Sequence, residues 1–439
     1  MTGIILGKDH IAVDPFVNRQ LEFDRLDALL KRHGPRGALV VVYGRRRVGK
    51  SRLLREWAGR HGGLHSQAIE GSSTLQLSAL YADLAAGLEP RIEPRTWEDL
   101  FALFDAQRHR TVVCLDEFPY LVAADPTLPS RMQKWLDRRG AKPLFLILSG
   151  SSTRMMHGAV LAPSAPLFGR AVQTLRVDSM TYGDFCRARH FRPGDPESFV
   201  RFSMVGGVPK YWEFCDEGDD AIALADSLFF RDAPYMEGEP GRLLADESLV
   251  GIGPMSVLEA IGRGAERPSE IAARMGARQT TMSKVLAQLV DAGMLVRDVP
   301  FGESVRNAKR TLYRIVDPAI RFWYRVASPH RTRWAGYARA QRTALLRAHA
   351  GTVFEDACRA LHIGARRYWE SDLEFDAVWK DEGRAGAMHV MECKLAMLTA
   401  AERRGTEGEL AQKWNRSRLA RAYTAPVFEV IDGRALARL

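Results

Sequence analysis

One octapeptide constrains the fold of this chain more than any other segment. Residues 44–51, Gly-Arg-Arg-Arg-Val-Gly-Lys-Ser, match the pattern G-x-x-x-x-G-K-[ST]. The apolar run at residues 38–43 predicts a buried parallel strand before it, and residues 52–57 predict a helix after it. The pattern therefore has the strand-loop-helix context of a phosphate-binding loop, and it predicts an α/β fold with a parallel sheet.

The residue types of this loop fit nucleotide chemistry. Gly44 and Gly49 let the backbone approach a phosphate, so that main-chain N–H groups and a helix N-terminus face the anion. Lys50 would place a charge on the β- and γ-phosphates of ATP, and the Ser51 hydroxyl would bind Mg²⁺. We interpret residues 45–47 as a solvated rim that attracts phosphate. The predicted nucleotide-binding loop comprises Gly44, Arg45, Arg46, Arg47, Val48, Gly49, Lys50, Ser51 and Arg52.

Two carboxylates follow a second apolar run. Residues 111–115 predict a buried strand, and Asp116 and Glu117 come directly after it. In a nucleotide site at the ends of parallel strands, Asp116 would hold Mg²⁺ and Glu117 would polarise the water that attacks the γ-phosphate. A paired acid can also be a simple helix cap, but the loop at 44–51 makes the catalytic interpretation the stronger one.

Polar residues after the next predicted strand, at 144–148, are candidate sensors of the γ-phosphate. Ser149 and Ser151 could contact the phosphate and the attacking water, or they could belong to an ordinary turn. Further on, Arg170 could reach the phosphates within its own subunit or from a neighbouring one. A surface ion pair explains Arg170 equally well, and the sequence leaves open whether the chain forms a homo-oligomer.

The middle of the chain has helical periodicity and then two short strands. Helices are predicted near residues 257–261, 268–276 and 280–290, with strands at 294–297 and 310–315 around a basic loop. This is the order of a winged helix-turn-helix. Arg278, Thr280, Thr281 and Lys284 would then face a DNA groove, and Arg306, Lys309 and Arg310 could contact phosphates. The unit could instead be a protein-interaction or packing module.

Near the C-terminus, charged residues alternate along a predicted strand. Glu392 and Lys394 share one face of residues 389–395, and Asp376 lies on the preceding strand. The resulting pattern D-x(n)-E-x-K can bind Mg²⁺ through oxygen ligands and orient a water beside the lysine, as phosphodiester hydrolysis requires. This segment resembles the PD-(D/E)XK restriction-endonuclease-like domain. The resemblance implies that Asp376 and Glu392 are metal ligands, that Lys394 is catalytic, and that Glu355 is the helix-borne acid.

Charge and composition narrow the class of protein. The net charge of +10 favours a polyanionic partner such as DNA, and arginines are frequent and acids few between residues 321 and 367. The five scattered cysteines are typical of buried free thiols in a reducing cytoplasm. We find neither a signal peptide nor an apolar run of membrane-spanning length, so we predict a cytoplasmic protein without a membrane partner.

Taken together, the motifs resemble the archaeal-type ATPase family, which is related to AAA+ and STAND proteins. The motifs include the loop at 44–51 and the segments Phe-Val-Asn-Arg, Leu-Asp-Glu-Phe-Pro-Tyr, Ser-Gly-Ser-Ser, Phe-Gly-Arg and Gly-Gly-Val-Pro-Lys-Tyr. The resemblance implies ATP hydrolysis with Mg²⁺, and it places Asn18 and Arg19 beside the adenine. It also implies a P-loop NTPase core at residues 1–178, a helical lid at 179–250, a winged helix at 251–327, and a basic connector with an α/β nuclease-like domain at 328–439.

Two functions remain open at this stage. In the first, ATP binding and hydrolysis reposition a DNA-binding winged helix and a metal-dependent nuclease-like domain. In the second, the chain is a nucleotide-controlled regulatory switch that binds DNA or protein without cleaving it. The sequence does not identify the DNA that would be recognised.

Overall fold

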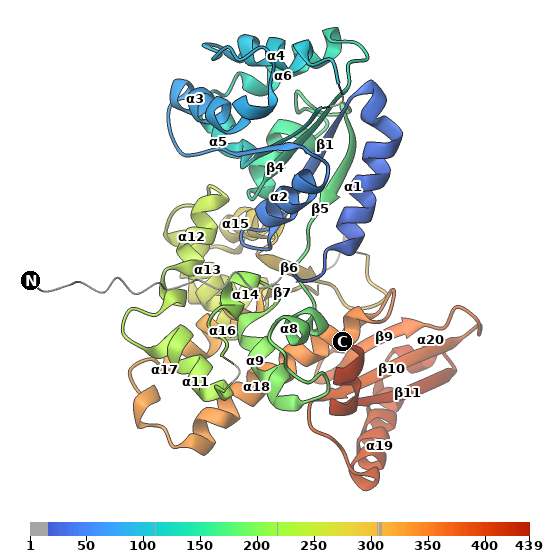
Figure 1. Ribbon diagram of the computed structural model, residues 1–439. Coiled ribbons are helices and arrows are strands. Elements are labelled where there is room, and N and C mark those ends of the chain that lie inside the picture. The colour runs from blue at the N-terminus through green and yellow to red at the C-terminus, as the bar shows by residue number, and fades with distance from the viewer. Residues whose placement is uncertain (1–15, 110, 217, 305, 307–309) are drawn as a thin grey trace, which may run out of the picture.

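The computed structural model describes residues 16–109, 111–216, 218–304, 306 and 310–439. One lobe of the molecule is a five-stranded parallel sheet with helices on both faces (Figure 1). The strand order is β2-β3-β4-β1-β5, and neighbouring strands pair in parallel. The strands are β1 (Ala38–Tyr43), β2 (Leu64–Gln67), β3 (Thr111–Asp116), β4 (Leu144–Gly150) and β5 (Ala171–Arg176).

Alternation along the buried strands creates two apolar cores, one on each face of this sheet. Val40, Val42 and Ile147 pack on the face covered by α1 (Gln20–His33) and α2 (Lys50–Arg60). Leu39, Val41 and the other strand side chains that alternate with these pack on the opposite face. The helices on that side are α3 (Ser73–Leu84), α4 (Trp97–Ala106), α5 (Phe118–Ala124) and α6 (Leu128–Arg138).

The order of the strands decides where the site forms. Strand β1 lies between β4 and β5, and β3 lies on the other side of β4. Because the strands are parallel, the segments that follow β1, β3 and β4 all emerge at the same edge of the sheet. The loop at 44–49, the acids at 116–117 and the serines at 149–152 are therefore neighbours at that edge, although they lie far apart in the sequence.

Short helices follow the sheet and lie beneath its loop-bearing edge (Figure 1). They are α8 (Tyr182–Ala188), α9 (Pro196–Val205), α10 (Pro209–Trp212), α11 (Ala221–Ala225) and α12 (Glu239–Asp246). Next come α13 (Ile252–Gly262), α14 (Pro268–Arg274) and α15 (Gln279–Asp291), and then the antiparallel strands β6 (Leu295–Asp298) and β7 (Leu312–Ile315). The predicted three helices and two strands of the middle region are thus present in the predicted order.

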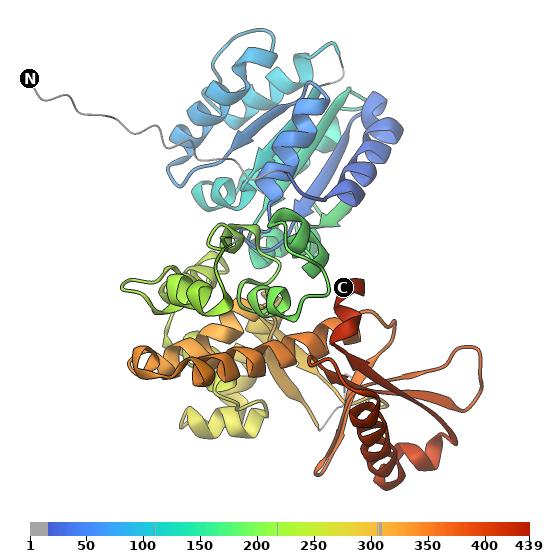
Figure 2. The ribbon, with the colours of Figure 1, turned by 60° about the horizontal axis from the view of Figure 1, so that its bottom comes forward.

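A second sheet, of four mixed strands, lies near the C-terminus (Figure 2). Its order is β11-β10-β9-β8, in which only the β10–β11 pair is parallel. The strands are β8 (Arg366–Glu370), β9 (Leu373–Lys380), β10 (Ala387–Lys394) and β11 (Ala425–Asp432). The long helix α18 (Arg339–Ala360) packs on one face and α19 (Ala400–Arg416) on the other. Shorter elements are α7 (Thr153–Met156), α16 (Pro318–Phe322), α17 (Ser328–His330) and α20 (Leu419–Ala422).

Most elements after the first sheet share one hydrophobic core, and a second cluster lies between the C-terminal sheet and α19. A single cluster of buried side chains runs from Tyr182 in α8 to Leu436 near the C-terminus, through α13, α15 and α18. The boundaries that we predict at residues 250 and 327 fall inside this cluster, so the division into separate domains stays a prediction. All five cysteines are buried and free, as predicted. In the part of the chain that the structure describes, none of the helices has the length and apolarity needed to cross a bilayer.

Candidate nucleotide site and C-terminal carboxylate cluster

The loop between β1 and α2 has the backbone shape that its glycines predict. Gly44 has φ 158°, and a Cβ at this position would lie 2.3 Å from the carbonyl oxygen of Val177. Gly49, which precedes the first turn of α2, has φ 96°, in the left-handed region that favours glycine. The Lys50 ammonium is buried at the start of α2 and donates to the Arg45 carbonyl at 2.9 Å. The loop backbone therefore forms a turn, and the hydrogen bond from Lys50 to the Arg45 carbonyl closes it.

Acidic side chains near Lys50 oppose the effect of burial on its pKa. Burial lowers the pKa of Lys50, and the negative charges of Glu117, Asp116, Asp246 and Glu247 oppose that shift. Two of these acids belong to the predicted catalytic pair, whereas Asp246 ends α12 and Glu247 follows it. Sequence analysis missed Asp246 and Glu247, because no local motif marks them.

Asp116 is fully buried at the end of β3 and is held by its neighbours. The Ser149 hydroxyl donates to Asp116 Oδ1 at 2.6 Å. Asp116 Oδ2 lies 3.7 Å from His65 Nε2, and neither atom has a hydrogen-bond partner among the described residues. Burial alone would raise the pKa of Asp116, but His65 and the hydroxyls of Ser149 and Ser51 lower it to about 2. An ionised carboxylate with one unpartnered buried oxygen, close to Ser51, fits a Mg²⁺ ligand.

Glu117 is held separately from Asp116. It has φ 54° at the N-terminus of α5, where its side chain makes no cap hydrogen bond. Its Oε2 accepts from the Ser151 hydroxyl at 2.8 Å and from the Ser151 N–H at 3.2 Å. The simple helix-cap alternative therefore does not describe this side chain. The serines that we treated as candidate sensors contact one acid each, Ser149 contacting Asp116 and Ser151 contacting Glu117.

The three loop arginines do not form the solvated rim that we expected from the sequence. Arg45 forms an ion pair with Asp317, which precedes α16. Arg46 Nη1 lies 2.6 Å from Asp246 Oδ1 at the end of α12. Arg47 forms an ion pair with the buried Glu239 at the start of α12. The loop is thus connected by salt bridges to two elements outside the first sheet.

Glu247 connects the lid region to the segment after β4. Its carboxylate accepts from the backbone N–H groups of Thr153 and Arg154 at 2.9 and 3.0 Å, and from the Ser152 hydroxyl at 3.2 Å. Burial raises its pKa, although these hydrogen bonds oppose the shift. The C-terminal end of α12 therefore covers the side of the site where Ser151 and Glu117 lie, next to a cavity of about 480 Å³.

The remaining nucleotide-site candidates differ in position. Arg19 is buried and donates to the Val48 carbonyl at 2.7 Å, and so it supports the loop from behind. Asn18 donates to Asp184 of α8 at 2.8 Å. The Arg52 guanidinium lies over the Phe16 ring, 5.6 Å from its centre. The contact of Asn18 and Arg19 with adenine stays a prediction, as does the contact of Arg52 with the nucleotide.

Arg170 lies at the wrong edge of the sheet for one of its two predicted roles. It precedes β5, which runs parallel to β1, so it is separated from the loop by the length of a six-residue strand, about 20 Å. Its guanidinium forms an ion pair with Asp137 at 2.8 Å. The predicted action on phosphates of its own subunit is therefore incorrect, because strand direction places it at the opposite edge. Action in a neighbouring subunit stays a prediction.

The sheet order and the loop at its edge define a P-loop ATPase fold. Residues 16–213 match the model of a family described as an ATPase domain predominantly from Archaea. This segment of the chain is therefore similar to the ATPase domain of that family, as the motifs implied.

Comparison with known proteins gives similarities along most of the chain. The sequence is 27% identical over 327 residues to an uncharacterized protein of Methanocaldococcus jannaschii, covering 72% of this chain and 69% of that protein. The fold is similar to that of a Walker-type ATPase of Pyrococcus abyssi, with a TM-score of 0.53 and 18% identity, covering 71% of this chain and 96% of that one. An ORC2 protein of Aeropyrum pernix matches with a TM-score of 0.44 and 16% identity, covering 75% and 98%.

The C-terminal candidates lie where two strands separate. Strands β9 and β10 pair as far as Ala377 and Met391, and Asp376 and Glu392 are the next residues. Asp376 Oδ2 accepts from the Cys393 N–H at 2.7 Å. Glu392 accepts from Lys394 at 2.9 Å and from Lys413 of α19 at 3.3 Å. Lys413 was not predicted, since only the packing of α19 on the sheet brings it to this carboxylate.

Glu355, Asp376, Glu392 and Lys394 interact electrostatically. Burial and then the charge of Asp376 raise the pKa of Glu355 to about 7. Burial and then Glu392 raise the pKa of Asp376 to about 6. Lys394 has a raised pKa: burial lowers it, but Glu392, Asp376 and Glu355 outweigh this effect. Among the described residues, no group of three or more His, Cys, Asp or Glu side chains is arranged to hold a metal ion. The two-carboxylate metal site at Asp376 and Glu392 stays a prediction.

The candidate DNA-contacting residues of the middle region separate into two groups. Arg278, Thr280, Thr281 and Lys284 are exposed at the N-terminal end of α15. Arg310, by contrast, pairs with Glu303 at 2.6 Å and donates to the Trp369 carbonyl of β8 at 2.9 Å, so it joins the hairpin to the C-terminal sheet. Lys309 lies outside the described residues.

Proposed function

We propose that this protein binds and hydrolyses ATP with Mg²⁺ at the edge of its parallel sheet. The main support for this proposal is that the loop with Lys50 and the acids Asp116 and Glu117 lie at the same edge of the sheet. Each of the two acids also accepts a hydrogen bond from a serine hydroxyl. Main-chain N–H groups and Lys50 would hold the phosphates. Ser51 and Asp116 would hold Mg²⁺, which neutralises phosphate charge when bound. Glu117 would orient the attacking water.

The direct test of hydrolysis is the variant Glu117→Gln. The amide keeps the size of the side chain but is a poor acceptor of a water proton, so binding should persist while steady-state phosphate release falls by about 100-fold or more. Ser78→Ala, an exposed change on α3, serves as the control and should keep wild-type turnover. Undiminished turnover in Glu117→Gln would mean that another group orients the water.

We further infer that the nucleotide state is coupled to the elements beyond the sheet, and that these elements bind DNA. The loop arginines support coupling, because Arg45 contacts Asp317 after the β6–β7 hairpin and Arg46 and Arg47 contact α12. The exposed N-terminal end of α15 and the net charge of +10 support DNA binding. ATPase rates measured with and without single-stranded, duplex and branched DNA test this coupling, which requires a change in rate with at least one form.

The carboxylate cluster favours a second activity, metal-dependent cleavage of DNA. Glu355, Asp376, Glu392 and Lys394 interact at the end of the β9–β10 ladder, and Asp376 and Glu392 supply oxygen ligands suited to Mg²⁺. The alternative is a regulatory switch that binds without cleaving. Nuclease assays with Mg²⁺ and Mn²⁺ on wild type and Lys394→Ala distinguish them. Equal inertness of both proteins on all three DNA forms favours the switch.

A further inference from the structure

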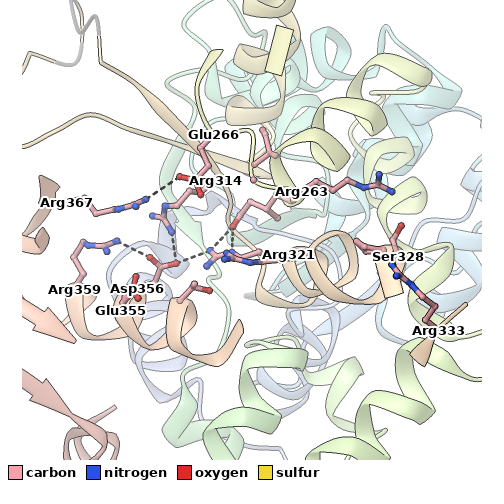
Figure 3. Close-up of a pocket in the computed structure, with 17 residues that line it drawn as sticks. Arg263, Glu266, Arg314, Arg321, Ser328, Arg333, Glu355, Asp356, Arg359 and Arg367 are labelled. Carbon is pink, nitrogen blue, oxygen red and sulfur yellow. Dashed lines mark hydrogen bonds and ion pairs between the residues drawn. The ribbon is translucent and has the colours of Figure 1, made fainter. Parts of the chain in front are cut away.

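A pocket of about 810 Å³ lies where the middle region meets the C-terminal sheet (Figure 3). It is enclosed by the end of α13, strand β7, helices α16 to α18 and strand β8. Seven of its lining residues are arginines and three are acids. Its volume lies within the range of about 300–1,000 Å³ that is typical of ligand sites in proteins. Arg263 and Arg367 pair with the acids Glu259 and Glu374 outside the lining, so the positive charge that an anion could neutralise belongs to the other arginines.

The arginines on one side of the pocket are held in place by Asp356. This carboxylate lies 2.5 Å from Arg314, 2.9 Å from Arg321 and 2.9 Å from Arg359, as Figure 3 shows. The three guanidinium groups lower the pKa of Asp356 strongly despite its burial, so it is ionised. Asp298 also pairs with Arg314, at 2.5 Å, so two carboxylates face the three arginines. This arrangement leaves one net positive charge on the wall, and guanidinium forks fixed in this way match the geometry of phosphate oxygens.

The other side of the pocket presents arginines that lack an acidic partner. Arg325 and Arg333 are exposed, and neither forms an ion pair within the described residues. In Figure 3, Arg333 and Ser328 lie at the end of the pocket away from Asp356. These two arginines are free to bind a ligand. The arginines around Asp356 are held in place by their ion pairs and would bind the ligand without rearranging.

Glu355 connects this pocket to the carboxylate cluster. It lines the pocket next to Asp356 on α18, and its charge interacts with that of Asp376. A phosphate bound among the arginines would therefore lie on the same helix face as an acid of the candidate cleavage site.

We propose that this pocket binds the phosphate groups of a nucleotide, either within a DNA strand or as a free mononucleotide. The strand-bound case rests on the proposed DNA-binding function and gives it a location: the backbone enters along Arg325 and Arg333 and passes Glu355. The free-nucleotide case does not depend on DNA binding. Both cases use the same phosphate chemistry.

The test compares wild type with the double variant Arg325→Glu/Arg333→Glu. Fluorescence anisotropy with labelled single-stranded and duplex DNA, in EDTA, measures affinity across a series of salt concentrations. We expect binding to weaken at least 10-fold, and the slope of log affinity against log salt to fall by about 1 for each DNA phosphate that the variant no longer binds. Arg108→Glu, a charge reversal at an exposed site on the ATPase lobe, should bind almost as wild type does. Arg333→Ala is a milder variant for use if the double variant has a lowered melting temperature.

A second arm removes the dependence on DNA. Calorimetric titration of deoxyadenosine monophosphate and pyrophosphate is performed in the Lys50→Ala background, so that the P-loop does not contribute. If DNA does not bind but these ligands do, and the arginine variants abolish their binding, the pocket takes a free nucleotide and the DNA-binding function is wrong. If DNA binds wild type and the arginine variants equally, and neither small ligand depends on the arginines, the pocket proposal is wrong and DNA binding stands. Absence of binding in both arms also overturns the proposal.

Discussion

Arg46 Nη1 in the P-loop lies 2.6 and 2.8 Å from the two carboxylate oxygens of Asp246, 200 residues further along the chain. This pair brings an acid from the end of α12 into the site where phosphates would bind, and the charge of Asp246 also reaches Lys50. An acid at this position would repel a triphosphate while it holds α12 against the loop. We therefore expect ATP binding and the contact between α12 and the loop to oppose each other.

The first prediction concerns this acid. Asp246→Asn removes one negative charge beside Arg46 and Lys50, so MgATP should bind more tightly. A partly exposed pair of this kind contributes about 1 kcal/mol, which corresponds to roughly a fivefold lower Kd. Glu237 lies in the turn before α12 and forms an exposed ion pair with Arg331. Glu237→Gln is therefore the control and should leave the Kd for MgATP unchanged. Weaker ATP binding in Asp246→Asn would show that the acid supports the site and does not oppose the ligand.

The second prediction separates two roles of Asp317. Its Oδ1 accepts from the Ile320 N–H at 2.7 Å, and its other oxygen forms the ion pair with Arg45. Asp317→Asn retains a cap for α16 but loses the charge, so we expect a loss of about 1–3 kcal/mol in unfolding free energy and a weaker effect of ATP on DNA affinity. Urea unfolding and anisotropy with and without ATP measure the two effects.

A matched control for Asp317 is Asp372→Asn. Asp372 pairs with Arg416 at 2.7 Å, but both side chains are well exposed. Exposed pairs contribute less than about 1 kcal/mol, so this variant should unfold almost as wild type does and keep the coupling. If both variants behave alike, the Arg45–Asp317 pair does not link the loop to the hairpin region.

The third prediction concerns pH and His349. This side chain is buried in α18, and Nε2–H donates to the Ser203 carbonyl at 2.8 Å. Burial, opposed by that hydrogen bond and reinforced by the charges of Arg321 and Arg325, lowers the pKa of His349 to about 3. Since the unfolded histidine has a pKa near 6.5, the unfolded state binds the extra proton between pH 6.5 and 3, and stability falls as the pH falls through that window.

His349→Gln removes this titration while it keeps an N–H donor. From pH 6.5 to pH 5 the histidine should cost wild type about 2 kcal/mol of unfolding free energy, at about 1.4 kcal/mol per pH unit. Urea unfolding measures the unfolding free energy of both proteins at the two pH values. Its decrease from pH 6.5 to pH 5 should be smaller by that amount in the variant than in wild type. His109→Gln, an exposed change on the ATPase lobe, should retain the wild-type pH dependence. An equal pH dependence in wild type and His349→Gln would contradict the assignment.

Local patterns predicted the central fold well, because they depend on short-range geometry. The continuous apolar runs before Gly44 and Asp116 form parallel strands that end at one sheet edge, so the parallel sheet followed from the sequence. At that edge the charges of Asp116 and Glu117 act on Lys50. The alternation along β10 likewise predicted the common face of Glu392 and Lys394, which the direct contact between them is consistent with.

Features that depend on contacts between distant parts of the chain could not be predicted from local patterns. The partners of Arg45, Arg46 and Arg47 lie 192 to 272 residues away, and no spacing rule links them. The sequence left two interpretations of Arg170 open, a phosphate contact or a surface ion pair. Strand direction places it at the edge opposite the loop, where it pairs with Asp137. The lid, the hairpin region and one face of the C-terminal sheet share a cluster of buried side chains, because their helices pack on one another. The sequence pattern does not reveal this shared packing.

The central claim is that the loop around Lys50 captures MgATP, and calorimetric titration of MgATP into wild type and Lys50→Ala tests it most directly. We predict a saturable heat signal for wild type with one site per chain. We also predict at least a 10-fold weaker affinity for Lys50→Ala, because the variant loses the buried ammonium that faces the phosphates. The absence of heat with wild type, or equal affinities for both proteins, would contradict the account.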